Sequence, residues 1–300
     1  MSRVALRIVG RAIWLMAVTF VATGVVYGVL ASAPGSEASL PPFGAWLWGA
    51  LRADLGISEH YRVGADVVGL VAEASMESFR VVGLALLMSM GMGLAVAATW
   101  WNRGRPTLSK TTRATTYLLS ASPAFLLAYW AQLAVNASVH RMVRSGWIDP
   151  PRWFPVPSDE GSIRYILAAL VLAIGSGMLM EAARSIHAEV ERVLSTDFIL
   201  FARASGRPLA AHLMPNLITP MASVMLNRLT ALFGGAVVIE VVFNVPGLGR
   251  LTWDAGLARD ARLLLAAAVV WALLYGVARL VAVAIPPLFD PRARATEDRT

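Results

Sequence analysis

Residues 234–260 read GGAVVIEVVFNVPGLGRLTWDAGLARD, and this stretch decides the fold. It starts as an apolar helix rich in small residues, in which Glu240 is the one acid, and runs into a turn made by Pro246, Gly247 and Gly249. A short polar segment follows and ends at Asp260, where the next apolar run begins. An ionised side chain in an apolar helix is costly in lipid. We therefore expect Glu240 to face a partner helix, the interior of a helix bundle or a water-filled path.

The composition is that of a protein embedded in a membrane. Of the 300 residues, 57% are hydrophobic and 15% are charged, whereas soluble domains carry about 25% charged residues. The net charge of +7 lies in short clusters beside the apolar runs, which is typical of cytoplasmic membrane flanks rather than of a nucleic-acid surface. The sequence has no cysteine, which excludes disulfides and thiolate metal sites. No grouping of histidines with acids indicates a metal site either.

Six runs are apolar and long enough to cross about 30 Å of hydrocarbon, which takes about 20 helical residues. They lie near residues 10–32, 79–101, 114–138, 162–180, 217–243 and 263–287. The sequence thus predicts a single all-α transmembrane domain over residues 1–300, with six membrane-spanning helices. Basic residues are more numerous in the loops on the side of the two ends, so the positive-inside rule predicts that both termini are cytoplasmic.

The longest segment on the outer side is predicted to cover residues 33–78. Prolines at its start break any continuation of the first helix. Trp46 and Trp48 suit a helix at the membrane interface, and residues 54–56 read as a turn.

A cytoplasmic loop over residues 181–220 is unusually long for a connection inside a bundle, and its pattern is helical. A short helix bracketed by Gly206 and Pro215 is expected to dock into a groove on another protein. The alternative is an amphipathic surface helix without a partner. The residues predicted to couple this loop to that protein are Ala202, Arg203, Ala204, Ser205, Gly206, His212, Asn216 and Pro220.

These motifs together resemble a known family, the permease subunits of ATP-binding-cassette importers in the oligopeptide, dipeptide and nickel branch. The family's coupling loop has Glu-Ala-Ala, three residues and a glycine, and here residues 200–206 read LFARASG, with leucine in place of the acid. The outer Gly-Asp-Leu-Gly-x-Ser segment of the family corresponds to residues 53–58, ADLGIS. Residues 235–250 and Asp260 match its most specific part, and residues 290–292, Asp-Pro-Arg, match its end.

The resemblance implies a type I importer fold with a cytoplasmic coupling helix, in the inner membrane of a bacterium. It implies a second, related permease, two ATPase subunits and an extracytoplasmic substrate-binding protein as partners, in addition to membrane lipid. The sequence has no phosphate-binding Gly-x-x-x-x-Gly-Lys motif, so we expect ATP and magnesium to be used by the partner ATPases and no cofactor to be bound directly. The implied cargo is a di- or oligopeptide, with nickel chelates, haem or another small solute as alternatives.

Arg228, Glu240 and Phe243 are predicted to line the translocation path, and the turn of Pro246, Gly247 and Gly249 is predicted to shape an outer gate. The alternative is that Arg228 and Glu240 each bond a neighbouring helix and stabilise the fold. On an ideal helix they lie about 18 Å apart and about 120° around the axis, so they are not expected to pair with each other. A membrane enzyme or a secondary transporter is disfavoured, because intramembrane polar residues are sparse and no inverted repeat is visible.

Overall fold

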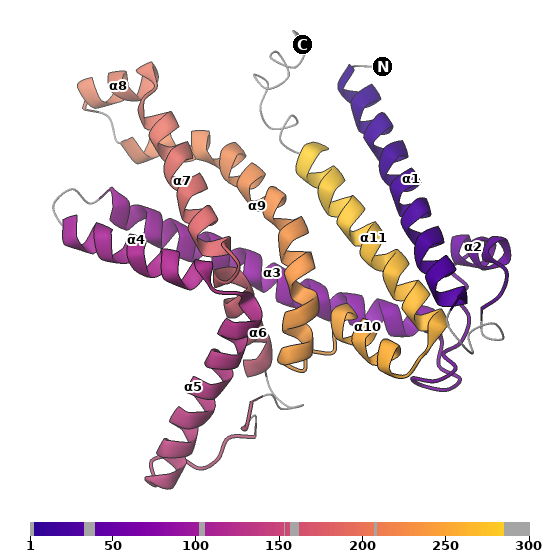
Figure 1. Cartoon of the computed structure of the whole chain (residues 1–300). Coiled ribbons are helices and arrows are strands. Elements are labelled where there is room, and N and C mark those ends of the chain that lie inside the picture. The colour runs from indigo at the N-terminus through magenta and orange to yellow at the C-terminus, as the bar shows by residue number, and fades with distance from the viewer. Residues whose placement is uncertain are drawn as a thin grey trace.

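The computed structural model describes residues 3–32, 40–101, 106–152, 154–156, 162–206 and 209–284. Within these ranges the chain forms helices and no strand, which confirms the all-α prediction (Figure 1). The helices are α1 (Arg3–Ala31), α2 (Phe43–Leu51), α3 (Val67–Trp100), α4 (Pro106–Ala121), α5 (Ala124–Arg144), α6 (Ile163–Ile174), α7 (Met178–Leu194), α8 (Asp197–Ala204), α9 (Leu209–Val242), α10 (Leu248–Leu257) and α11 (Ala261–Ala284). The last residues of the expected sixth span, and Asp290-Pro291-Arg292, lie outside the described part.

Four single helices, α1, α3, α9 and α11, are long and apolar enough to cross a membrane. Two further crossings are possible if each of two bent pairs counts as one span, namely α4 with α5 and α6 with α7. The bends are 105° and 59°, respectively. The expected spans 114–138 and 162–180 are therefore not straight helices. Hydropathy measures how apolar a segment is and contains no information on the direction of the helix axis, so it does not predict such a bend.

The first of these breaks follows from Pro123. Proline lacks the N–H that would continue the helix, and it disfavours helical backbone at the residue before it. Pro123 itself is extended, with φ −57° and ψ 139°, and it caps the start of α5. The second break contains Gly175, Ser176 and Gly177, and the last two have positive φ angles of 52° and 85°.

Polar backbone groups at the two breaks bond to each other. The Gly177 N–H donates to the carbonyl of Ser120 at 2.6 Å, and the Ser176 N–H donates to the carbonyl of Ser122 at 3.1 Å. The hydroxyl oxygen of Ser120 also accepts a hydrogen bond from the Met180 N–H at 3.0 Å. Interrupted helices leave orphan donors and acceptors, which are tolerated at membrane depth only where protein satisfies them. Each break therefore supplies the partners that the other one needs.

Helix α3 begins earlier than the sequence predicted, at Val67, because Asp66 caps it by accepting from the Gly69 N–H at 2.8 Å. The end of the expected outer segment 33–78 is thus helical. At about 1.5 Å per residue the 34 residues of α3 extend about 51 Å, well beyond about 30 Å of hydrocarbon. The acids Glu73 and Glu77 mark the edge of the apolar run and not the end of the helix.

The loop over residues 181–220 differs from the expectation. The short helix is α8, which lies before Gly206 and not between Gly206 and Pro215. Gly206 ends this helical turn with a φ of 68°. The long helix α9 already starts at Leu209 and includes Pro215 and Pro220, so these prolines do not delimit a separate element. A proline inside a helix costs about 3 kcal/mol, which a helix packed on several neighbours can tolerate.

Helix α3 is the axis of the bundle, since it contributes to all three buried apolar clusters. With α6 and α9 it forms the largest cluster, and with α10 and α11 it forms the second. The third joins its last turns to α7. Figure 1 shows α3 crossing behind the other helices, with α8 at the far end of α7 and α10 at the opposite end of α9.

We expect the contact between the two breaks to be intolerant of added volume at Gly175. A Cβ there would lie 2.9 Å from the Cα of Ala124. Overpacking of this kind typically costs about 1–3 kcal/mol, so Gly175→Ala should lower the midpoint of thermal unfolding in detergent. Gly91→Ala is the matched control, because a Cβ at Gly91 meets nothing within 4 Å and alanine favours a helix. Equal midpoints for the two variants would contradict the packing described for the breaks.

Candidate functional site

Glu240 is fully buried near the end of α9, and its carboxylate lies at the start of the next helix. Its Oε2 accepts a hydrogen bond of 2.7 Å from the N–H of Gly249, the second residue of α10. The first N–H groups of a helix have no partner within it, and the helix dipole favours a negative charge there. The acid in the apolar helix is therefore bonded within the chain, to the N-terminus of α10.

The turn between these helices needs glycine because the chain passes so close to the carboxylate. A Cβ at Gly247 would overlap the carboxyl group of Glu240. A Cβ at Gly249 would lie 2.5 Å from the Cα of Val237 and 2.9 Å from Oε2 of Glu240. Helix α3 joins the same turn, since the Ser78 hydroxyl accepts from the Leu248 N–H at 2.8 Å. One polar cluster thus links α3, α9 and α10.

A second buried acid, Asp260, precedes α11 and holds the segment around Ser58. Its Oδ1 accepts from the Leu263 N–H at 3.1 Å, in the first turn of α11. Its Oδ2 accepts from the Ser58 hydroxyl at 2.7 Å. The same oxygen accepts from the backbone N–H groups of Glu59, His60 and Tyr61 at 3.0, 3.1 and 3.2 Å.

These bonds explain the acidity of Asp260. Burial by itself would raise the pKa of the carboxyl, but hydrogen bonds from Ser58, His60, Leu263 and Tyr61 outweigh it and hold the pKa below its usual value. Ser58 and Asp260 each belong to a motif that is visible in the sequence, but their pairing is not visible there. The available signal was an acid at the helix-capping position before the last apolar run.

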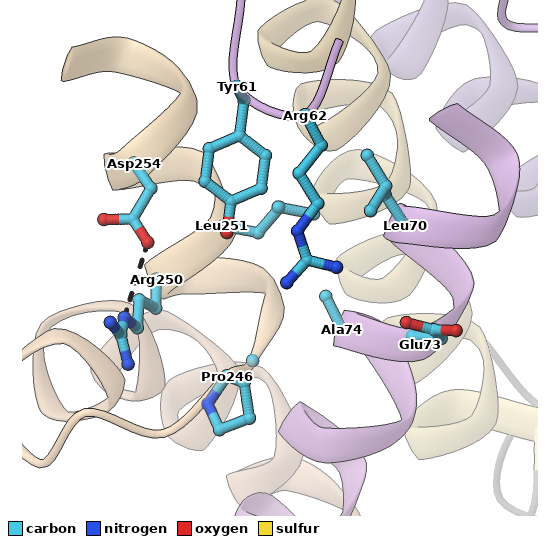
Figure 2. A pocket seen from close by; sticks show the side chains of 10 residues that line it. Tyr61, Arg62, Leu70, Glu73, Ala74, Pro246, Arg250, Leu251 and Asp254 are labelled. Atoms are coloured by element: carbon cyan, nitrogen blue, oxygen red, sulfur yellow. Dashed lines mark ion pairs between the residues drawn. The ribbon is translucent and has the colours of Figure 1, made fainter. Parts of the chain in front are cut away.

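A pocket of about 180 Å³ opens beside this assembly (Figure 2). The segment held by Asp260 contributes Tyr61 and Arg62, and the remaining walls come from α3 and from α10 with the turn before it. Arg250 and Asp254 form an ion pair of 3.4 Å, and the Arg62 guanidinium lies 5.7 Å from the centre of the Tyr61 ring. The lining residues are Tyr61, Arg62, Leu70, Glu73, Ala74, Pro246, Gly247, Arg250, Leu251 and Asp254. Positively and negatively charged side chains therefore line the pocket. Such a lining is suited to contact with a polar surface or a polar solute.

Arg228 is buried in the middle of α9, twelve residues before Glu240 and next to the paired helix breaks. Only 4% of its surface is exposed. Its Nη1 donates to the carbonyl of Met178 at 2.7 Å, and its Nη2 lies 3.7 Å from a carboxylate oxygen of Glu181. Both partners are in the first turn of α7. Arg228 thus pairs with α7 and not with Glu240, as the helical spacing indicated.

All three residues predicted to line a path, Arg228, Glu240 and Phe243, are buried against neighbouring helices. The first two have the helix partners that the alternative prediction required. A path-lining role for them stays a prediction, and it requires α9 to separate from α7 or α10.

The residues predicted to couple to another protein fall on α8, on the turn after it and on the start of α9. Ala204, Ser205 and Gly206 are exposed, and the aromatic ring of Phe201 on α8 is 67% exposed. The side chains of Ala202, Arg203, His212, Asn216 and Pro220 lie outside the described part. Phe201 was not among the predicted residues, although an aromatic residue directly before the predicted coupling residues is a signal that could have identified it.

Replacing Asp260 by asparagine should loosen the segment at Ser58–Tyr61, because the amide has no charge and only one acceptor oxygen, whereas the carboxylate accepts with both of its oxygens. Hydrogen bonds to a charged group are worth about 1.5–3 kcal/mol each, so cleavage by trypsin after the exposed Arg62 should be faster by about tenfold or more. Asp254→Asn is the control on the same face, since its carboxylate bonds only to Arg250 in the described structure. Equal cleavage of both variants and the wild type would contradict the assigned role of Asp260.

The depressed pKa of Asp260 also fixes the sign of a pH effect. The stabilisation is present above the ordinary pKa of about 3.9 and is lost as the pH falls through the lower folded-state value. The difference in unfolding midpoint between wild type and Asp260→Asn should therefore shrink below about pH 4. A difference that grows on acidification would have the wrong sign.

Comparison with known proteins identifies the family. The family described as binding-protein-dependent transport system inner membrane component matches residues 89–295. The chain is similar to the metal-staphylopine import system permease protein CntB of Staphylococcus aureus, with 27% identity over 83% of this chain and 76% of that protein. It is 29% identical to a protein named as a peptide transport system permease of Brucella abortus, over 84% and 79% of the two chains. A similarly named protein of Brucella suis is 32% identical over 72% and 68%. The chain therefore belongs to the family of inner membrane components of binding-protein-dependent transport systems.

Proposed function

We propose that this chain is the translocation subunit of an importer whose ATP hydrolysis takes place in separate ATPase subunits. The observation that carries the proposal is the family match over residues 89–295, which includes the exposed helix α8 and the turn at Gly206. A short exposed helix held at the end of α7 is suited to insertion into a groove of a partner protein. ATP and magnesium are then bound by that partner.

The proposed cargo is a di- or oligopeptide. Relatives named as peptide transport permeases support this cargo, and the relative named for metal-staphylopine import supports a metal chelate, such as one of nickel, as the alternative. Haem or another small solute remains a further alternative. A peptide carries an amine and a carboxylate, which suits the mixed charges of Arg62, Glu73, Arg250 and Asp254 around the pocket in Figure 2.

A second, related permease is proposed to complete the path. Helix α5 leaves the body of the bundle at the 105° bend, as Figure 1 shows, and it exposes Phe125, Tyr129 and Trp130 by more than half. An apolar face of this kind needs lipid or protein to cover it. We assign part of it to a related permease in a heterodimer and the rest to lipid.

The proposed orientation in the bacterial inner membrane has both termini and α8 in the cytoplasm. The excess of basic residues on that side supports it. In Figure 1 the start of α1 and the end of α11 also point the same way as α8, whereas α10 lies at the opposite end. The pocket beside α10 then faces the extracytoplasmic substrate-binding protein.

The proposed mechanism is a shift between two populations. Closure of the ATPase pair moves α8, and α8 is joined to the bundle through α7 and α9. Arg228 ties α9 to the first turn of α7, so a movement of α7 is passed on to α9 and to the turn at its outer end. Nucleotide can drive this change only if it has different affinities for the two states.

A bulky residue at Gly206 should uncouple the permease from its ATPase. Gly206 has a positive φ and open space around it, so Gly206→Trp changes the exposed surface after α8 without a clash in the core. We expect normal membrane insertion and loss of ATPase co-purification. ATP-dependent uptake should fall by about tenfold or more, which is the effect of losing one strong contact in a protein interface. The matched control is Gly146→Trp after α5, where φ is likewise positive and a Cβ meets nothing within 4 Å.

Retained co-purification in Gly206→Trp, or equal loss in both variants, would remove the docking assignment. Uptake that continues at full rate with a catalytically inactive partner ATPase would contradict the proposed importer itself. The two results are distinguishable, because the first concerns the variants alone and leaves the ATP dependence of wild-type uptake intact.

A further inference from the structure

A groove of about 680 Å³ lies between α4 and α7, at the end of the bundle where α3 stops. It continues into a second hollow of about 390 Å³ toward Ser120 and Gly177, since Tyr117, Met180 and Arg184 line both. The residues of the first hollow are Trp100, Lys110, Arg113, Ala114, Tyr117, Met180, Arg184 and His187. The groove is separate from α8 and from the pocket beside α10.

Three cations converge on one end of this groove without carboxylate partners among the described residues. Lys110, Arg113 and Arg184 are all exposed, and no ion pair involves any of them in that part of the chain. The acids of α7 near the groove have other partners. Glu181, which lines the second hollow, lies 3.7 Å from Arg228, and Glu191 lies 3.3 Å from the groove residue His187. Glu189 in turn pairs with Arg192 at 2.8 Å. Across the two hollows, three cations thus face one lining acid, and the excess positive charge suits an anion.

Aromatic rings form the floor beneath these cations. The Arg113 guanidinium lies 4.7 Å from the centre of the Trp100 ring, and the Trp101 ring lies 4.9 Å from that of His187. The indole N–H of Trp100 and Nδ1 of His187 are buried without a hydrogen-bond partner among the described residues. Tryptophan with arginine and lysine at the end of a spanning helix is typical of the level of the lipid headgroups.

Most of the remaining wall is apolar, and Ser120 and Glu181 are the polar residues that line the second hollow with Arg184. Ala114, Tyr117 and Met180 continue the groove away from the cations, and Leu118 beside them is 68% exposed. A soluble anion would use only the charged end, whereas a phospholipid would fill both ends. Basic pockets between transmembrane helices are suited to anionic headgroups.

We propose that this groove binds the headgroup phosphate of an anionic phospholipid, with Lys110, Arg113 and Arg184 around the phosphate and an acyl chain along Tyr117 and Met180. The site would fix the start of α4 against α7. It would thereby make the packing of these two helices dependent on the lipid.

Quenching of tryptophan fluorescence tests this site directly. The full chain, with the subunits that co-purify with it, is titrated in detergent with brominated phosphatidylglycerol. Each cation near a phosphate contributes about fivefold in affinity, the equivalent of about 1 kcal/mol. Arg113→Gln/Arg184→Gln should therefore weaken binding by about 25-fold, and Trp100→Phe should remove the quenched component.

Arg192→Gln is the control on the same helix as Arg184, because Arg192 is exposed but paired with Glu189. The affinity of this variant for brominated phosphatidylglycerol should equal that of the wild type. If the double variant does not fold, Lys110→Gln alone should weaken binding by about fivefold. Equal quenching by brominated phosphatidylcholine would overturn the proposal, as would full competition by inorganic phosphate. Unchanged affinity in the cation variants, or an equal loss in Arg192→Gln, would also overturn it.

Discussion

The hydrogen bond between the Glu240 carboxylate and the N-terminus of α10 is the contact on which the half of the molecule that contains α10 depends. An acid in an apolar helix must find a partner, and here the partner is the Gly249 N–H of the next helix. The carboxylate leaves no room for side chains at Gly247 and Gly249, which explains the glycines of the turn. Because this contact fixes where α10 starts, it also fixes where α11 follows. Asp260, at that junction, then holds the segment around Ser58.

Much of the fold could be predicted from the sequence, because a helix in contact with lipid must consist mainly of apolar residues. The apolar runs predicted long apolar helices, and three of these runs overlap α1, α9 and α11, which are long and apolar enough to cross a membrane. The bends between α4 and α5 and between α6 and α7 could not be derived in this way. Pro123 and Gly177 were visible signals, but the hydrogen bonds that make the breaks tolerable join residues more than 50 positions apart.

In the candidate site, too, some residues could be predicted from the sequence and their partners could not. The sequence identified Glu240, the turn after it and Asp260 as special, since they break the apolar pattern. Their partners were not predictable, because Ser58 lies 202 positions from Asp260 and Ser78 lies 170 positions from Leu248. For Arg228 and Glu240 the structure provides the neighbouring-helix partners that the sequence left open. Charged groups of a kind suited to a path can therefore serve first to join helices, and a transport role requires a second conformation.

Hydrogen exchange at the Gly249 amide is the most direct test of the central interaction. Removing the acceptor leaves a buried donor unsatisfied, at about 1–3 kcal/mol, so Glu240→Ala should accelerate exchange there by about five- to 150-fold. Glu240→Gln, which keeps an acceptor oxygen and loses the charge, should fall between Glu240→Ala and the wild type. Glu189→Ala on α7 should leave the amide unchanged. If Gly249 is equally protected in Glu240→Ala and in the wild type, the buried acid does not hold α10, and the half of the molecule that contains α10 does not depend on this contact.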